Sequence, residues 1–254
     1  MPFTKSNNKY ELDEHEHTLH MWTPLQVEVT KDYKFVPKSF LFHFFSWFVY
    51  FIIIPILGIY NYLWYGFRIQ GREKLKLVKG GKITVTNHIH PMDCTFVSLA
   101  TFPHKLYFPT LKSNLEIPVI SKLIRLLCAI PIPSGMDAKK KFVKAIDTLL
   151  QTGKTVQIYP EVAMWSYHDR LRHFKNGAFE FAVKSKVPVI PMVYTFREPK
   201  GIWKRKRKPC ITLQILDPVY PNKEANNRKE AVIQLREQVY DRMAQYQLQV
   251  NKNR

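Results

Sequence analysis

The sequence predicts an α/β fold: a single αβ domain with a mostly parallel sheet flanked by helices, preceded by an N-terminal membrane-embedded helical segment. Three observations support this prediction. After residue 68, short β-branched runs alternate with amphipathic segments, as in folds that pack helices on a parallel sheet. Residues 39–67 contain no Asp, Glu, Lys or Arg. A chain of 254 residues is long enough for one such domain and one appended element.

The first segment, residues 1–38, is polar and lacks a strong hydrophobic period. It contains His15, His17 and His20 beside two glutamates, side chains of the type that bind metal ions. No cysteine accompanies them, and chain ends are commonly loosely ordered. We therefore interpret residues 1–38 as a surface segment.

Residues 39–67 are predicted to form a membrane anchor, because a crossing helix needs about 20 mostly apolar residues. The stretch starts too late and is too long for a cleaved signal peptide. Pro55 and Gly58 allow either one kinked helix or two short helices that enter one leaflet and return. A buried pair of core helices is the alternative, disfavoured by the lack of a polar face. Aromatic residues typical of the lipid–water boundary are frequent: Trp47, Tyr60, Tyr62, Trp64 and Tyr65.

The net charge of +19 is concentrated after the apolar stretch. Residues 1–67 contain five Lys and six Asp or Glu, a net charge of −1, which leaves +20 for residues 68–254. Such a charge indicates an anionic partner: nucleic acid, a membrane with anionic lipids or an acidic carrier protein. By the positive-inside rule, the basic part is expected on the cytoplasmic face of the membrane.

Residues 68–254 are predicted to form the αβ domain. Pro91 suits the first turn of one helix, and Gly153 ends another. Cys94, Cys128 and Cys210 are far apart and predict buried free thiols in a reducing compartment. In chain order we expect a strand at 83–86, a helix from 91 to about 101, a strand at 106–108, a helix from 117 to about 127, an extended segment at 129–132, a helix at 138–151, a strand at 155–159, a helix at 177–184, strands at 189–196 and 211–216, and a last amphipathic helix with Val232, Leu235, Val239, Met243 and Tyr246 on its apolar face.

Polar residues follow the first of these strands: Asn87, His88 and, at the start of the next helix, Asp93. Ligands of open α/β sheets bind at the carboxyl ends of the strands. A histidine held by a carboxylate is a good general base, because the carboxylate fixes the tautomer and stabilises the imidazolium. The spacing alone is weak evidence, since an acid also suits the first turn of a helix. A metal site that includes His90 is the alternative, but no further ligand is evident and no metal is predicted.

Two later segments strengthen this interpretation. Pro160 and Glu161 follow the strand at 155–159, and Val-Pro-Val-Ile-Pro occupies residues 187–191. Together with Asn-His-x-x-x-x-Asp at 87–93 and Lys-x-Gly-Ala at 175–178, these segments resemble the glycerolipid acyltransferase family, the PlsC-like lysophosphatidate acyltransferases. The resemblance covers roughly residues 68–220.

The resemblance implies an acyl transfer in phospholipid biosynthesis. His88 would be the catalytic base for a hydroxyl of a lysophospholipid or related glycerolipid, and Asp93 would orient it. The hydroxyl would attack the thioester of acyl-CoA or an acyl carrier protein, with no cofactor, no metal and no covalent acyl-enzyme. The implied partners are a membrane, the acyl donor and a lysolipid acceptor, with no nucleic acid. The residues predicted to contact substrate are Asn87, Pro160, Glu161, Arg170, Arg172, Lys175 and Gly177.

The chain departs from the family pattern at two places. The family's third block is Phe-Pro-Glu-Gly-Thr-Arg, whereas Val162-Ala163-Met164 follows Glu161 here. The second block ends in Arg, and the equivalent residues 130–137 contain none. Both arginines belong to phosphate recognition, in which a guanidinium is hard to replace. We therefore expect an acceptor other than lysophosphatidic acid, another lysolipid or a glycolipid. The candidates to replace the two arginines are Arg170, Arg172, Lys175 and Lys139–Lys141.

Residues 197–208 carry seven positive charges and one negative charge around Trp203. Such a cluster attracts anionic lipid, and a tryptophan suits an interfacial loop. A solvated hairpin tip and a docking site for an acidic acyl carrier protein are the alternatives.

Two other functions compete with an acyltransferase. The charge and the interleaved aromatic residues suggest a nucleic-acid-binding protein, but no recognition motif is present and the apolar stretch has no role in one. The altered third block suggests a catalytically inactive lipid-binding protein on the same fold. The retention of both His88 and Asp93 argues against that alternative.

Overall fold

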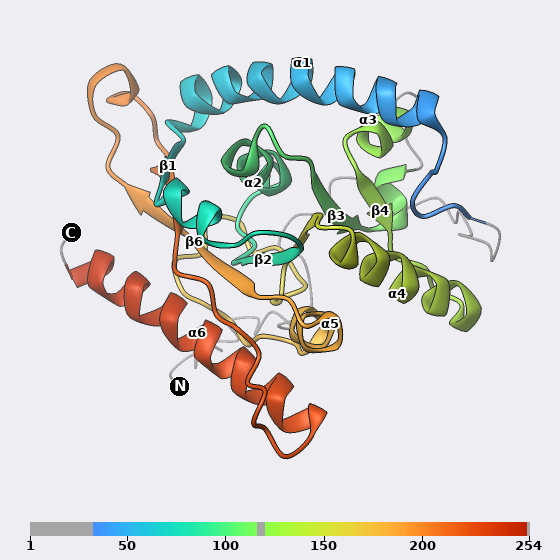
Figure 1. Cartoon of the computed structure of the whole chain (residues 1–254). Helices are drawn as coiled ribbons and strands as arrows, with labels where there is room; N and C mark the ends of the chain where they lie inside the picture. The colour runs from blue at the N-terminus through green and yellow to red at the C-terminus, as the bar shows by residue number, and fades with distance from the viewer. Residues whose placement is uncertain (1–32, 116–119, 253–254) are drawn as a thin grey trace, which may run out of the picture.

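The computed structural model describes residues 33–115 and 120–252, and the histidines of the first segment lie outside these residues (Figure 1). A seven-stranded sheet forms its centre, in the order β1-β7-β6-β2-β5-β3-β4. All neighbouring strands are parallel except β6 and β7, which form an antiparallel hairpin, so the predicted mostly parallel sheet is confirmed. The strands are β1 (Arg68–Gln70), β2 (Lys82–Thr86), β3 (Leu106–Thr110), β4 (Ala129–Pro131), β5 (Thr155–Ile158), β6 (Val189–Arg197) and β7 (Cys210–Ile215).

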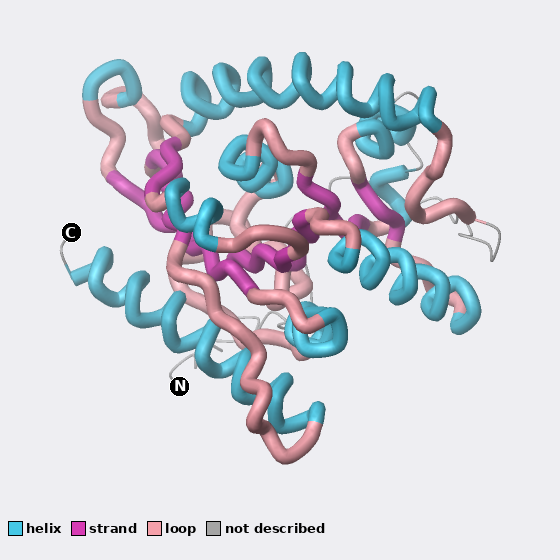
Figure 2. The backbone as a smooth tube through the Cα atoms, in the orientation of Figure 1, coloured by secondary structure: helices cyan, strands magenta, loops and turns pink. Residues whose placement is uncertain are grey.

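Helices cover both faces of this sheet, as Figures 1 and 2 show. One layer contains α4 (Met136–Gln151), α5 (Gly177–Ser185) and α6 (Arg228–Lys252). On the other face, α2 (Asp93–Thr101) lies under α1 (Phe40–Tyr65), which also contacts α3 (Ile120–Leu126). Three short 3₁₀ helices connect these elements: η1 (Arg72–Leu77), η2 (Lys112–Leu115) and η3 (Gly201–Trp203).

Strand β6 separates two apolar cores, because successive side chains of a strand point to opposite faces. Val189 and Val193 pack with α4, α5 and α6. Ile190, Met192 and Tyr194 pack on the side of α2. Both faces of β6 are buried, which explains its nearly continuous apolar sequence.

Helix α1 is a single helix that continues through Pro55. It is the one described helix that is long and apolar enough to cross a membrane, by length and composition. A stripe of its residues nevertheless contacts the domain: the Tyr50 hydroxyl donates to the His104 carbonyl oxygen at 3.1 Å, and Asn61 Nδ2 donates to Thr95 Oγ1 at 2.9 Å. The opposite side of the helix exposes large apolar side chains, including Phe44, Phe48, Ile52, Ile56 and Ile59.

The helices and strands agree closely with the sequence-based expectation, with two differences. The helix expected from Pro91 begins at Asp93, because residues 91–92 form a turn. Strand β1 was not predicted, since its three residues have no apolar pattern and are held in place by pairing with β7. The expected start of α3 at residue 117 lies outside the described residues.

Candidate active site

His88 and Asp93 meet at the carboxyl end of β2. His88 lies in the loop that follows this strand, and Asp93 is the first residue of α2. His88 Nδ1 lies 2.8 Å from Asp93 Oδ2. Against a carboxylate, Nδ1 carries the proton and donates it, so Nε2 keeps its lone pair. The arrangement can therefore accept a proton at Nε2 and stabilise the resulting imidazolium.

The Asp93 carboxylate is held rigidly. Its Oδ2 also accepts the backbone N–H groups of Ile89 at 2.8 Å and His90 at 3.1 Å. Burial raises the pKa of the Asp93 carboxyl, while the hydrogen bond and the charge of His88 act in the opposite direction. The amino end of α2 further favours a negative charge at this position. Asp93 is thus fixed as an orienting group and has no exposed surface for substrate.

Asn87 joins the His88 loop to the neighbouring strand β6. Its Oδ1 accepts the backbone N–H of Tyr194 at 2.8 Å, and its Nδ2 donates to the Tyr194 carbonyl oxygen at 3.4 Å. The Tyr194 hydroxyl donates to the Asp93 carbonyl oxygen at 3.1 Å. Asn87 is fully buried, and its two hydrogen bonds to β6 fix the backbone from which the next residue, His88, projects.

Glu161 and Arg172 form a buried ion pair on the other side of His88. Arg172 Nη2 lies 3.1 Å from Glu161 Oε2, and the backbone N–H of Arg172 donates to Glu161 Oε1 at 3.0 Å. The same Oε2 accepts the backbone N–H of His88 at 3.2 Å. The Arg172 guanidinium also donates to the Ala163 carbonyl oxygen and lies 4.7 Å from the ring centroid of Trp165. Glu161 is therefore occupied in holding the His88 loop.

The loop after β5 runs along the His88 loop and is bonded to it. The N–H of Trp165 donates to the His88 carbonyl oxygen at 3.0 Å, and the N–H of Tyr167 donates to that of Ile89 at 3.0 Å. Val162 adopts φ +65°, a left-handed conformation that is strained for a β-branched residue. Val162 stands where the family pattern has Gly, the residue that most readily adopts this conformation.

His90 lies beside the dyad in an aromatic surrounding. Its ring centroid is 4.5 Å from that of Tyr65 and 5.7 Å from that of Tyr167. Burial, together with the positive charges of Lys208 and Lys206, lowers the pKa of His90 to about 4. The ring is therefore neutral at physiological pH. In the described part of the chain, no group of three or more His, Cys, Asp or Glu side chains is arranged to hold a metal ion.

The structure brings together Asn87, His88, Asp93, Glu161 and Arg172. The remaining residues predicted to contact substrate lie in or after the β5 loop. Pro160 is buried, and its carbonyl oxygen accepts the N–H of Lys175 at 2.8 Å, whereas Arg170, Lys175 and Gly177 are exposed. A Cβ atom added to Gly177 would meet nothing within 4 Å, so this position does not require glycine on steric grounds.

Sequence reasoning missed the aromatic residues that frame His88 and His90. Tyr159 stacks on the His88 ring with centroids 4.2 Å apart, while Tyr65 and Tyr167 contact His90. Tyr159 is the last residue of the strand predicted at 155–159 and directly precedes Pro160. This position at the carboxyl end of a strand could have indicated that its ring lies at the site. Tyr65 belongs to the predicted anchor, and only the packing of α1 brings it to the site.

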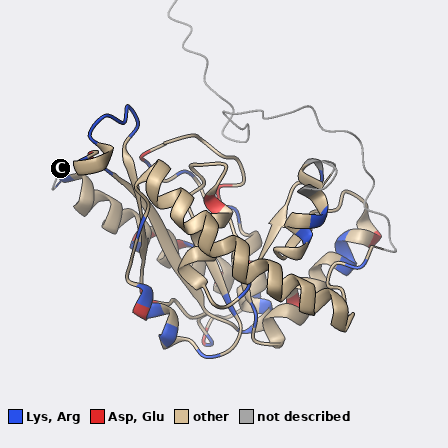
Figure 3. Cartoon of the chain, turned by 90° about the horizontal axis from the view of Figure 1, so that it is seen from above, with Lys and Arg blue, Asp and Glu red and all other residues tan. Residues whose placement is uncertain are grey.

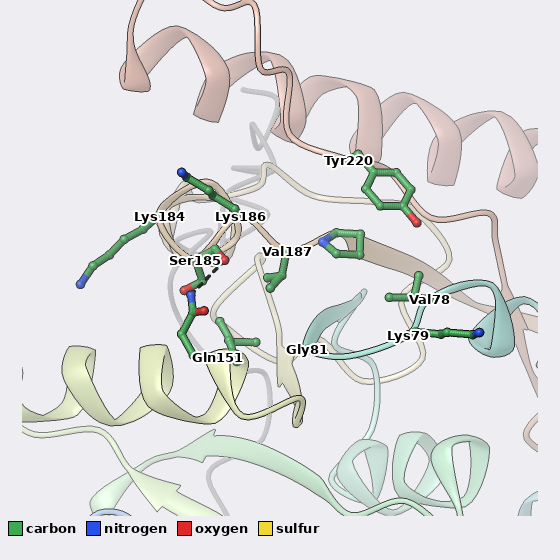
Figure 4. Close-up of a pocket in the computed structure, with 11 residues that line it drawn as sticks. Val78, Lys79, Gly81, Gln151, Lys184, Ser185, Lys186, Val187 and Tyr220 are labelled. Carbon is green, nitrogen blue, oxygen red and sulfur yellow. Dashed lines mark hydrogen bonds between the residues drawn. The ribbon is translucent and has the colours of Figure 1, made fainter.

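A cavity of about 680 Å³ lies at the opposite edge of the sheet (Figure 4). Lys79 and Gly81 precede β2 there, and Lys186 and Pro188 precede β6. The cavity is therefore at the amino ends of these strands, away from His88. The three lysines that were candidates to replace the family arginines, Lys139–Lys141, lie in α4. This helix follows β4, which is three strands away from β2 and His88.

Comparisons with known proteins agree on one family. Residues 66–195 match the model of the family described as Acyltransferase. The chain is 30% identical over 133 residues to the 1-acyl-sn-glycerol-3-phosphate acyltransferase BAT2, chloroplastic, of Brassica napus, and 29% identical over 133 residues to LPAT1, chloroplastic, of Arabidopsis thaliana, a protein of the same description. These matches cover 52% of this chain but only 38% and 36% of the two plant proteins, so the chain matches less than two fifths of their length.

The fold also resembles a solved structure. The crystal structure of the 1-acyl-sn-glycerophosphate (LPA) acyltransferase, PlsC, from Thermotoga maritima superposes with a TM-score of 0.54 at 18% sequence identity. The superposition covers 83% of this chain and 95% of that chain. At this identity the likeness concerns the fold.

Proposed function

The chain belongs to the acyltransferase family, and we propose that it transfers a fatty acyl group from an acyl thioester to the free hydroxyl of a 1-acyl-glycerol 3-phosphate at a membrane surface. The observation that carries this proposal is the His88–Asp93 pair at the carboxyl end of β2, with Nδ1 bound to the carboxylate and Nε2 left as the base. The acceptor follows the names of the two plant relatives. The two absent family arginines favoured an acceptor other than lysophosphatidic acid. Because of the names of the relatives, we propose lysophosphatidic acid in its place.

The proposed reaction needs one base and one activated donor. His88 Nε2 takes the hydroxyl proton of the acceptor as its oxygen attacks the thioester carbonyl. The tetrahedral intermediate then collapses, the C–S bond breaks, and the imidazolium returns the proton to the departing thiolate. A thioester is already activated, so we assign no metal and no cofactor beyond the donor, acyl-CoA or an acyl carrier protein. Asp93 stabilises the imidazolium, while Asn87, Glu161 and Arg172 act as positioning residues for the His88 loop.

The proposed membrane contact is made by α1, which lies in the plane of one leaflet. Ser46, Tyr50, Ile54 and Asn61 follow each other along one side of the helix and are buried against the domain. A helix docked along its length in this way cannot leave the domain to cross the bilayer without exposing this stripe. Its outer face is apolar and inserts among the lipid chains. The basic surface fits the expected position on the cytoplasmic face.

The central test is acyl transfer by the detergent-solubilised protein with His88→Ala as the key variant. Labelled palmitoyl- and oleoyl-CoA and an acylated carrier protein are offered with a panel of lysolipids. We expect transfer to lysophosphatidic acid, reduced by about 10²- to 10⁴-fold in His88→Ala. His104→Ala removes an exposed histidine and is expected to keep the wild-type rate.

Either of two outcomes would contradict the proposal. A folded His88→Ala protein, checked by circular dichroism, that keeps more than about a tenth of the rate would exclude His88 as the base. Lysolipid binding without transfer from any donor would favour the inactive lipid-binding protein instead.

A further inference from the structure

The hairpin between β6 and β7 is strongly basic and begins beside the candidate active site. Strand β6 is the direct neighbour of β2, so its carboxyl end lies at the same edge of the sheet as His88. From Arg197 to Lys208 the chain carries seven positive charges and one negative charge. Figure 3 shows the blue hairpin next to one end of the uncharged helix α1.

The hairpin is fixed against the end of α1. The buried Trp203 donates from its indole nitrogen to the Leu63 carbonyl oxygen at 2.9 Å and to that of Tyr62 at 3.1 Å. Arg197 donates to the carbonyl oxygen of Gly66, the residue that ends α1. These contacts hold the part of the hairpin that precedes Lys206 and Lys208 against α1.

Two of these lysines point to the aromatic residues around His90. Lys206 Nζ lies 5.8 Å from the ring centroid of Tyr65, and Lys208 Nζ lies 4.7 Å from that of Tyr167. Both rings contact the His90 ring. The backbone N–H of His90 donates to Asp93 Oδ2, the same oxygen atom that His88 Nδ1 contacts. The two ammonium groups thus approach the dyad from the side of α1.

The positive charge of this pair is not neutralised within the described part of the chain. There, neither Lys206 nor Lys208 forms an ion pair with a carboxylate. Arg172 is committed to Glu161, and Lys139–Lys141 are three strands away from β2. Lys206 and Lys208 are therefore two cations beside the aromatic residues around His90 that can bind an anion.

We propose that Lys206 and Lys208 bind the phosphate of the acceptor glycerolipid and replace the two arginines that the family pattern has and this chain lacks. This inference rests on the proposed acyl transfer. Lysine recognises phosphate as a point charge and does not need the forked geometry of arginine. An acceptor whose acyl chain lies in the leaflet beside α1 brings its head group to Tyr65 and the hairpin, which favours the acceptor over the CoA phosphates as the ligand.

The test is steady-state kinetics of Lys206→Gln/Lys208→Gln in detergent micelles, where membrane binding plays no part. We expect the KM for lysophosphatidic acid to rise by about tenfold or more, since both charge-assisted contacts are lost. The kcat is expected to stay within about threefold and the KM for acyl-CoA within about twofold, because the base and the donor contacts are unchanged. The control Lys79→Gln/Lys186→Gln removes the same charge at the opposite edge of the sheet, and its KM for lysophosphatidic acid is expected to stay at the wild-type value.

Three results would overturn the inference: an unchanged KM for lysophosphatidic acid, a rise in the KM for acyl-CoA in its place, or an effect seen on anionic vesicles and absent in micelles. If the wild-type protein shows no transfer, the proposed function fails and binding is measured directly by tryptophan fluorescence. We then expect the wild-type protein to prefer lysophosphatidic acid over monoacylglycerol by about tenfold, and the double variant to lose this preference. Equal binding of the two lipids by the wild-type protein would reject the phosphate site independently.

Discussion

Glu161 and Arg172 are both almost fully buried, so removal of either leaves the charge of the other in apolar surroundings. Glu161 also accepts the backbone N–H of His88. The pair therefore affects both the stability of the fold and the position of the base.

We predict that Arg172→Met lowers the free energy of unfolding by about 3–5 kcal/mol. Among the described residues, the buried Glu161 carboxylate then keeps the backbone N–H groups of His88 and Arg172 as its hydrogen-bond donors. Glu161→Gln is expected to be destabilising as well, and the double variant Glu161→Gln/Arg172→Met to recover part of the loss. Urea unfolding of the three variants measures this coupling, and strictly additive losses would contradict it.

His90 gives a second prediction at the residue scale. In the folded protein its pKa is lowered to about 4, by burial first and by Lys208 and Lys206 next, whereas an unfolded histidine titrates near pH 6.5. Between these values the unfolded chain binds a proton that the folded protein does not bind. Stability is therefore expected to fall as the pH drops from 6.5 towards 4.

The measurement is urea unfolding of the wild-type protein and of His90→Gln at several pH values between 4.5 and 7. The variant should show a flatter dependence over this window. An equally steep fall in both proteins would assign the acid sensitivity to other groups.

At the scale of the element, α1 has two sides with different tasks. The inner side carries Tyr50 and Ile54 into the packed interior, and the outer side exposes large apolar and aromatic residues. A truncation at residue 67 would remove both sides together. Substitutions on the outer side separate membrane binding from folding.

We predict that Phe44→Ser/Phe48→Ser/Ile52→Ser releases the protein from neutral vesicles and leaves its melting temperature nearly unchanged. Anionic vesicles are expected to retain the variant at low salt through the basic hairpin and to release it at high salt, where charges are screened. Vesicle flotation at both salt concentrations measures this. Ile54→Ala is the matched inner-side control, expected to cost about 2–5 kcal/mol of stability. Unchanged flotation of the triple variant on neutral vesicles would contradict the insertion of α1.

At the scale of the whole molecule, the sheet gathers residues from distant segments at one edge. Strand β2 supplies His88, β5 leads to Glu161, and β6 leads to the basic hairpin. The C-terminal end of α1 is bonded to this hairpin, so the apolar helix and the basic hairpin are neighbours (Figure 3). A lipid in a membrane on this side can approach the dyad with its head group first.

The sequence by itself determined the fold class, the order of the elements and the pairing of His88 with Asp93. These features are local: they depend on hydrophobic period, on turn residues and on a spacing of five positions across one strand end. The apolar face of α6, predicted from Val232, Leu235 and Val239, is buried as expected, because a helical stripe of this kind needs a core to cover it.

The tertiary structure alone decided three further features: the docking of α1 along the domain, the ion pair of Glu161 with Arg172, and the approach of Lys206 and Lys208 to His90. Each depends on contacts between segments that no local sequence pattern links. An example is the hydrogen bond from Arg197 to the carbonyl oxygen of Gly66, 131 positions apart. Three-residue strand β1 belongs to the same class, since its conformation comes from β7 and not from its own residues. Local preference sets which elements form, whereas the burial of charge and of apolar surface between distant elements sets what surrounds the reacting groups.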